Sequence, residues 1–337
     1  MQWRRHVIGL AFSFVFVVSY FTNKFVLSVL NFTYPTLFQG WQTFIGAVLL
    51  LMSGKLGWVE MSRVSRSAAL SWLPGSLLFV GNIYAGSRAL SRIDIPFFFT
   101  LQNSSHVVSF CIIKVLQREK THWLKFISLC LMLLSAFNLP LFDPQLDYSG
   151  YLWAACHLFC VGAYRVFQVH SKSNNLSDYE QQCINYLFSQ RNMQGKGSYS
   201  CVNPTKILSD VLLCSVSTTD SSSCLHISVL LLALAAHPTG DLTGALEFPS
   251  LQSRTFHCGC CASALLGFFM LLASVRLKRG ISLHHFRVWI FLSKVTAMSL
   301  SPFIFYMNIN ISSCLCVVTS HAGEALLLYS DSDTQPS

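Results

Sequence analysis

The sequence predicts an all-α polytopic membrane protein with about ten transmembrane helices, and three observations support that fold class. Of the 337 residues, 53% are hydrophobic and only 11% are charged, whereas roughly 25% are charged in an ordinary soluble domain. The mean hydropathy is +0.50. The apolar residues gather in successive stretches of about 20, which is the length of helix that crosses a bilayer.

The expected spans follow one another along the chain with short connections. The first continues past Lys24 without a signal-peptide cleavage site, so we expect it to be retained. The spans are 7–30, 36–53, 68–90, 95–116, 123–142, 149–170, a seventh assembled from 183–188 and 228–238, then 256–278, 286–308 and 313–330.

Loop charge predicts the orientation of these spans. Lys and Arg accumulate in the short cytosolic loops of membrane proteins. With a cytosolic N-terminus, the basic clusters at 4–5, 55–66, 118–125 and 276–287 all fall on the cytosolic side. We therefore expect both termini in the cytosol, with residues 331–337 as a cytosolic tail. The net charge of +9 is explained by topology, and no nucleic-acid partner is expected.

The polar segment 189–227 interrupts the seventh span. It is rich in Ser, Thr, Asn and Gly, and it separates two apolar pieces that would make one good span if joined. A long loop is the simpler interpretation. We favour an insertion within the seventh helix, because unstructured loops of this length are uncommon in a compact domain.

A break in composition at 143–148 divides the chain into a first transmembrane half, 1–142, and a second half, 149–330. Each half holds about five helices by span length. Because five is odd, the second half would run inverted relative to the first, an architecture that many transporters share.

Several expected spans carry polar side chains that are costly in lipid. Amides commonly tie helices together, and a lysine near a span end, as Lys294 is expected to be, can reach the interface. Lys24 and Glu324 should pair with each other, or one of them should meet a charged ligand. The candidates for ligand contacts are Tyr20, Asn23, Lys24, Tyr84, Gln102, Asn103, Asn185, Lys294 and Glu324.

Amide, hydroxyl, aromatic and basic groups at similar depth suit a ligand with a ring to stack, edges to hydrogen-bond and an anionic group. A nucleotide diphosphate sugar fits that description, and an inorganic cation does not, because no ring of carboxylates is present. No metal site or cofactor is expected, since the cluster His257–Cys261 has no second cluster at zinc spacing. The sequence contains no G-x-S-x-G or P-loop motif that would indicate an enzyme.

The stretches SYFTNKFVLSVLNFTYPTLFQGWQT, GNIYAGSRALSRIDIPFFFTLQNSSHVV and AGEALLLYS resemble the nucleotide-sugar transporters of the drug/metabolite transporter superfamily. The chain is similar to the fungal GDP-mannose transporters in that family. The resemblance implies ten helices in two inverted bundles. It also implies exchange of a cytosolic nucleotide sugar for a luminal nucleoside monophosphate across the Golgi membrane, without an enzymatic step.

Two substrate motifs of the fungal transporters are altered here. The seventh-helix F-Y-N-N becomes Cys183–Tyr186, in which only Asn185 matches, and G-A-L-N-K becomes Ser320–Glu324, which lacks the Asn-Lys pair. The losses weaken GDP-mannose as the ligand. The resemblance implies UDP-N-acetylglucosamine exchanged for UMP first, GDP-mannose as the alternative, and an inactive variant if the insertion disrupts the seventh helix.

Partners beyond the bilayer, the nucleotide sugar and the nucleoside monophosphate are not required, and a homodimer is left open. Two sequons, at Asn31 and Asn310, are candidate glycosylation sites on the luminal side, close to helix ends.

Overall fold

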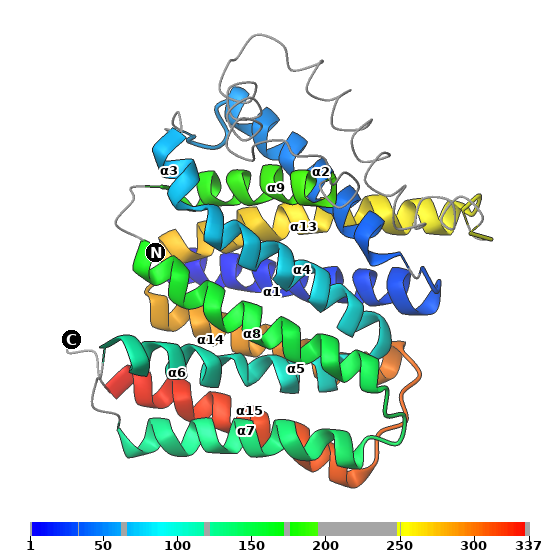
Figure 1. Ribbon diagram of the computed structural model, residues 1–337, viewed down its shortest axis with the longest axis vertical. Coiled ribbons are helices and arrows are strands. Elements are labelled where there is room, and N and C mark those ends of the chain that lie inside the picture. Colours follow the sequence, from blue (N-terminus) through cyan, green and yellow to red (C-terminus); the bar gives the residue numbers. More distant parts are fainter. Residues whose placement is uncertain are drawn as a thin grey trace, which may run out of the picture. The chain divides into compact units, whose positions relative to one another are not determined.

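The structure is a computed structural model that describes residues 2–32, 34–61, 66–117, 122–171, 176–194, 248–249 and 251–333. Over these residues the fold is helical and contains no strand, as the sequence predicts. The elements are α1 (Gln2–Lys24), η1 (Phe25–Val29), α2 (Pro35–Lys55), α3 (Arg66–Ser71), α4 (Leu73–Arg92), α5 (Ile95–Asn103), α6 (Ser105–Gln117), α7 (Trp123–Phe142), α8 (Tyr148–His170), α9 (Asp178–Gln194), α13 (Arg254–Gly280), α14 (Leu283–Ile304) and α15 (Ile311–Asp333) (Figure 1).

Within the described part of the chain, 6 helices are long and apolar enough to cross a membrane. The protein is therefore a multi-pass helical membrane protein, and the expectation of about ten spans is confirmed only in part. α4, with 20 residues, and α14, with 22, are long enough to cross but are less apolar. The 6 spans are Arg5–Val29, Pro35–Lys55, Trp123–Phe142, Tyr148–His170, Arg254–Gly280 and Ile311–Ser332.

The fourth expected span is not one continuous helix. α5 ends at Asn103 and α6 begins at Ser105, with Ser104 between them. The Ser104 amide donates to Leu101 at 3.0 Å, which is the tighter i to i−3 pattern, and its hydroxyl donates to the Met132 carbonyl on α7 at 3.2 Å. Short polar side chains compete for backbone partners in this way, and they weaken a helix where they cluster.

The seventh expected span is described only at its first part. A capping box starts α9, because the Ser177 amide donates to Glu180 at 2.8 Å and the Glu180 amide donates to the Ser177 hydroxyl at 3.3 Å. The helix continues through Ser189 to Gln194. The rest of the expected insertion, and the apolar piece 228–238, lie outside the described residues.

The helices group into two compact units. One comprises 1–33, 81–169 and 269–337, and the other comprises 34–80 and 170–268. Each unit takes segments from both of the sequential halves 1–142 and 149–330, and that division into halves stays a prediction.

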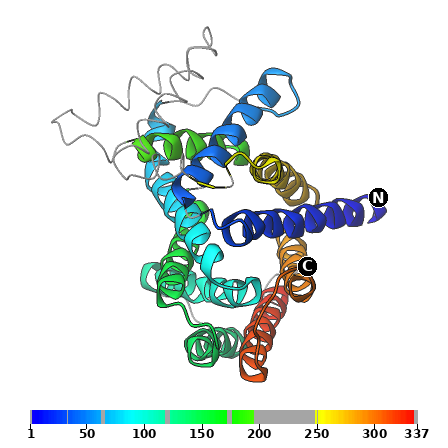
Figure 2. The same cartoon turned by 90° about the vertical axis from the view of Figure 1, so that its right-hand side faces the viewer.

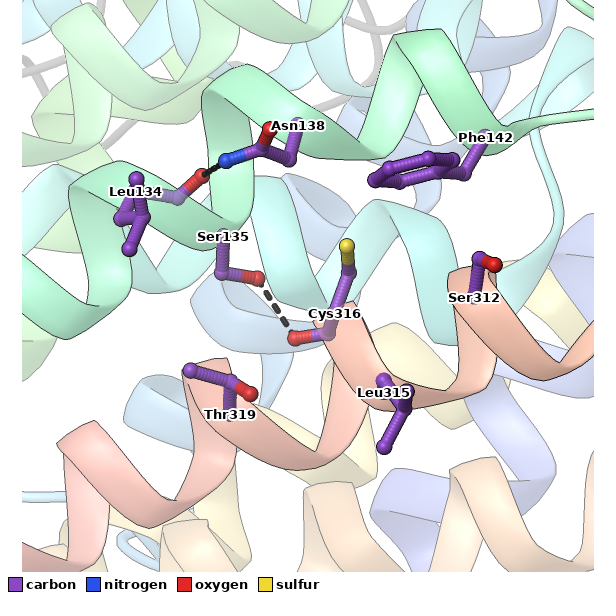
Figure 3. A pocket seen from close by; sticks show the side chains of 8 residues that line it. All are labelled: Leu134, Ser135, Asn138, Phe142, Ser312, Leu315, Cys316 and Thr319. Carbon is purple, nitrogen blue, oxygen red and sulfur yellow. Dashed lines mark hydrogen bonds between the residues drawn. The ribbon is translucent and has the colours of Figure 1, made fainter.

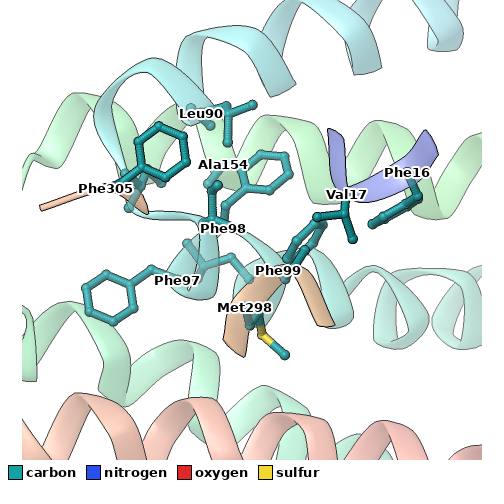
Figure 4. Close-up of a cluster of buried hydrophobic side chains, with 14 of the residues drawn as sticks. Phe16, Val17, Leu90, Phe97, Phe98, Phe99, Ala154, Met298 and Phe305 are labelled. Atoms are coloured by element: carbon teal, nitrogen blue, oxygen red, sulfur yellow. The ribbon is translucent and has the colours of Figure 1, made fainter. Parts of the chain in front are cut away.

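The first unit is built around α5. Every α5 residue except Gln102 is buried, and Phe97, Phe98 and Phe99 fill the centre of an aromatic core (Figure 4). Phe16 of α1 stacks on Phe99 with 5.9 Å between ring centroids. This packing fixes the depth and rotation of α5, and it thereby positions Asn103 at its end.

α7 and α15 lie side by side in both views of the first unit (Figures 1 and 2). Their close approach depends on Gly323, where an added Cβ would lie 2.9 Å from the Ser128 carbonyl oxygen of α7. Small residues at such contacts let two membrane helices approach closely.

In the second unit, α2 packs on α9. The Tyr186 ring of α9 covers Gly46 of α2, at 3.0 Å from the position that a Cβ would occupy. Phe79 meets the same ring edge-on, with 6.0 Å between centroids.

Candidate functional site

A buried ion pair lies in the interior of the first unit. Lys294 Nζ lies 2.6 Å from Glu324 Oε1 and donates to Asn103 Oδ1 at 2.8 Å. The three residues are 3%, 5% and 0% exposed, and they come from α14, α15 and α5. Lys294 therefore does not extend its amine to an interface, as a lysine near a span end would, because it sits near the middle of α14.

Asn103 links this pair to the next turn of α15. Its Nδ2 lies 3.3 Å from the Ser320 hydroxyl and 3.3 Å from His321 Nε2. The Ser320 hydroxyl in turn donates to the Thr100 carbonyl at 3.3 Å. Asn103 is the last residue of α5 before the break at Ser104, so a helix end lies directly at the ion pair, as at the discontinuous helices that form transporter sites.

Arg165 of α8 adds a second cation. Its Nη1 lies 3.3 Å from both ring nitrogens of His106 on α6. It also interacts electrostatically with Glu324, Lys294 and Tyr20. Sequence reasoning missed this residue, although an arginine inside the span 149–170 was a visible signal, because intramembrane charges are functional candidates by default.

A polar chain connects α1 to α8 around the same region. The Tyr20 hydroxyl interacts with the Gln102 side chain, and Gln102 Nε2 lies 3.3 Å from His157 Nε2. His157 Nδ1 in turn lies 3.0 Å from the Asn82 carbonyl oxygen. We call the three charged residues Lys294, Glu324 and Arg165, together with the neutral Asn103, the central cluster, and Tyr20 and Gln102 border it.

The central cluster suits an anionic ligand. Two cations and one carboxylate leave a net positive charge, and Arg can bind a phosphate through two parallel hydrogen bonds. Amide and hydroxyl groups nearby can read the polar edges of a base or a sugar. Five sequence-predicted residues, namely Tyr20, Gln102, Asn103, Lys294 and Glu324, are thus brought together.

Lys24 has a different environment. Its Nζ donates to the carbonyl oxygens of Leu90 at 3.0 Å and Ile93 at 2.8 Å, at the end of α4. The expected pairing of Lys24 with Glu324 is therefore wrong, because Glu324 pairs with Lys294. A π-helical turn, η1, follows Lys24 directly; such turns are frequent at functional sites. Asn23 precedes Lys24 on the same helix.

Tyr84 and Asn185 lie in two further environments. The Arg88 guanidinium sits 5.6 Å from the Tyr84 ring centroid, and its Nε donates to the Tyr84 hydroxyl at 3.3 Å. Asn185 belongs to the second unit, where its Oδ1 accepts from Trp72 Nε1 at 3.0 Å and from the Ser76 hydroxyl at 2.9 Å.

Comparison with known proteins gives the family. No protein-family model matches the chain. A Xenopus laevis protein described as "UDP-N-acetylglucosamine transporter TMEM241 homolog" is 47% identical over 98% of this chain and 99% of its own length. The "UDP-N-acetylglucosamine transporter TMEM241" of Mus musculus is 44% identical over 98% of each chain. The chain belongs to the nucleotide-sugar transporter family.

Similarity within the nucleotide-sugar transporters extends to shorter matches. "GDP-mannose transporter 2" of Neosartorya fischeri is 34% identical over 87 residues, which is 26% of this chain and 24% of that protein. All three relatives are described as transporters, in agreement with the expectation that this chain is not an enzyme.

The structure also locates the remaining sequence features of this family member. Asn310 caps α15, because its Oδ1 accepts from the Ser313 amide at 2.7 Å while its Nδ2 donates to the Phe142 carbonyl at 2.8 Å. Asn31 ends the first span with a φ of 54°, a conformation that asparagine tolerates. Glycosylation at both positions stays a prediction. The described residues contain no group of three metal ligands.

A groove of about 260 Å³ lies between α7 and α15 (Figure 3). Leu134, Phe142 and Leu315 supply its apolar walls. Across its floor, the Ser135 hydroxyl donates to the Cys316 carbonyl at 2.5 Å. The described residues that line the groove are uncharged, in contrast to the central cluster.

Proposed function

We propose that this nucleotide-sugar transporter imports UDP-N-acetylglucosamine into the Golgi lumen in exchange for UMP, with both termini in the cytosol. The observation that carries the proposal is the 47% identity, over 98% of the chain, to a relative described as a UDP-N-acetylglucosamine transporter. A buried cluster with a net positive charge, at the ends and middles of several helices, supports an anionic substrate.

The residues take the following proposed roles. Lys294 attracts the phosphates; Lys24 does so only in a state of the cycle in which it releases its two carbonyl partners. Tyr20 or Tyr84 stacks on the base. Gln102 and Asn103 read base or sugar edges, with Asn23 and Glu324 as further contacts. For Asn185, in the second unit, a contact with the ligand stays a prediction. About ten helices rock as two halves and expose the site to each side in turn.

GDP-mannose is the alternative substrate, which the 34% identity to a GDP-mannose transporter over 87 residues favours. The altered motifs at Cys183–Tyr186 and Ser320–Glu324 argue against it, because guanine contacts of that family would be missing.

Exchange in proteoliposomes tests the proposal. The full chain is reconstituted into liposomes loaded with UMP, and uptake of labelled UDP-N-acetylglucosamine is measured while unlabelled UDP-, GDP- and CMP-sugars compete. We expect uptake that depends on internal UMP and is inhibited best by UDP-sugars. If GDP-mannose alone inhibited uptake, GDP-mannose would become the proposed substrate in place of UDP-N-acetylglucosamine. Uptake no greater than in protein-free liposomes would reject transport.

A deletion tests the inactive-variant alternative. An insertion within the seventh helix should disturb backbone hydrogen bonding that lipid cannot replace. We expect the chain lacking residues 189–227 to exchange faster than the full chain. Equal rates in matched proteoliposomes would reject the idea that the insertion impairs this form.

A further inference from the structure

The charges of the central cluster do not cancel. Among the described residues, Glu324 is the only acidic side chain in the interior of a helix; the others lie in loops or in terminal turns. It forms an ion pair with one cation, Lys294, and interacts electrostatically with a second, Arg165. An uncompensated positive charge inside a membrane span is costly, and it is retained where an anion neutralises it.

Arg165 has hydrogen-bond donors left for such an anion. Among the described residues, Arg165 forms hydrogen bonds only through Nη1, to His106, and it forms no ion pair within 4.0 Å there. The guanidinium carries five N–H donors in a rigid fork. Most of that fork is thus available to a ligand.

Glu324 is also incompletely satisfied. Its Oε1 binds Lys294 at 2.6 Å, but its buried Oε2 has no hydrogen-bond partner among the residues that the structure describes. A carboxylate with one oxygen on an ammonium presents the same contact that a phosphate oxygen would make. Glu324 occupies the position on Lys294 that an anionic ligand needs.

We propose that Glu324 is an internal counter-ion that the phosphates of the ligand displace from Lys294, and that Arg165 is the second phosphate-binding cation. This inference rests on the proposed function and assigns its phosphate site. In the empty carrier Glu324 neutralises Lys294. In the loaded carrier the ligand bridges Lys294 and Arg165, while Asn103 Oδ1 can keep its bond of 2.8 Å from Lys294.

Displacement of Glu324 predicts a change in nucleotide affinity that a merely structural ion pair does not predict. Ligand binding to the native chain must break the Lys294–Glu324 contact, whereas binding to E324Q need not. Removing the carboxylate should therefore tighten binding of UDP-N-acetylglucosamine and UMP by about tenfold or more, because breaking a buried pair is expensive. Removing Arg165 as R165Q should weaken binding by about tenfold or more.

The test uses the full chain in lipid nanodiscs, with affinities for both nucleotides measured by calorimetry. Controls are D331N and R287Q, a carboxylate of α15 and an arginine of α14 that pair with each other at the helix ends; both should bind within about twofold of the native chain. Gel filtration checks that each variant is folded.

If E324Q does not fold, the charge-swapped variant K294E/E324K tests the counter-ion role of Glu324 instead. It keeps an ion pair but moves the ammonium to α15, so nucleotide binding should be lost. Native affinity in the swap, or unchanged or weaker affinity in folded E324Q, would overturn the counter-ion role. If the native chain binds neither nucleotide, both the counter-ion role and the proposed function are rejected. If the native chain binds but folded E324Q does not bind more tightly, only the counter-ion role is rejected and the proposed function stands.

Discussion

Replacing Gly323 by alanine should destabilise the contact between α7 and α15. The new Cβ would lie 2.9 Å from the Ser128 carbonyl oxygen, 3.1 Å from Met132 Cγ and 3.3 Å from Leu131 Cβ. A backbone oxygen cannot rotate away as the end of a side chain can, so the two helices must separate by several tenths of an ångström. Overpacking of this kind typically costs about 1–3 kcal/mol.

The chain offers a matched control in Gly267 of α13, where an added Cβ would meet nothing within 4 Å. There only the intrinsic preference of a helix for alanine acts, which is about 1 kcal/mol in favour of the variant. The same gain applies at Gly323. The expected difference between G323A and G267A is therefore the overpacking cost of about 1–3 kcal/mol.

The assay is thermal unfolding in detergent, followed by the fraction of monodisperse protein on size exclusion after heating. G323A should melt below the native chain, and G267A should melt at or above it. A G323A protein that melts with or above G267A would show that the close approach of α7 and α15 does not exist, and the position of Glu324 would then need revision.

Three further predictions follow from other contacts. K24A should lower the melting temperature, because two carbonyls at the end of α4 lose their donor, and it should slow exchange; unchanged exchange contradicts the phosphate role of Lys24. N185L should destabilise by about 1–3 kcal/mol for each donor that it leaves unsatisfied, whereas N138L, at a partly exposed position where the side chain bonds only its own helix, should melt close to the native chain. Partial burial raises the pKa of Asp147, but hydrogen bonds from Arg92 and two backbone amides outweigh it and lower the pKa. This carboxylate therefore stabilises the protein at neutral pH and loses that effect as the pH falls through its folded pKa; D147N should flatten the acid limb of a melting-temperature profile.

Helix content and membrane character could be predicted from the sequence because both depend on local composition. Runs of apolar residues located the 6 spans that the described residues contain, and costly polar residues within the expected spans pointed to Asn103, Lys294 and Glu324. Their partners could not be predicted, since periodicity describes one helix at a time. Glu324 meets Lys294 of α14, and not Lys24 of α1, through the way that α5, α14 and α15 pack.

Two other features could not be predicted from the sequence, for different physical reasons. Lys24 binds backbone carbonyls, and no side-chain pattern records which backbone groups lie at the end of a neighbouring helix. The break at Ser104 depends on a hydroxyl reaching Met132 on another helix. The run Asn103–Ser105 hinted at a weak point, but a continuous helix was equally compatible with the hydropathy.

The two bonds from Lys24 to the end of α4 have a mechanical consequence. If α1 moved away from Leu90 and Ile93, the buried Lys24 ammonium would lose both of its carbonyl acceptors. That loss would cost about several kcal/mol. The first helix and the last turns of α4 should therefore move together as one rigid piece, except in a state in which a ligand phosphate replaces the two carbonyls as the partner of Lys24.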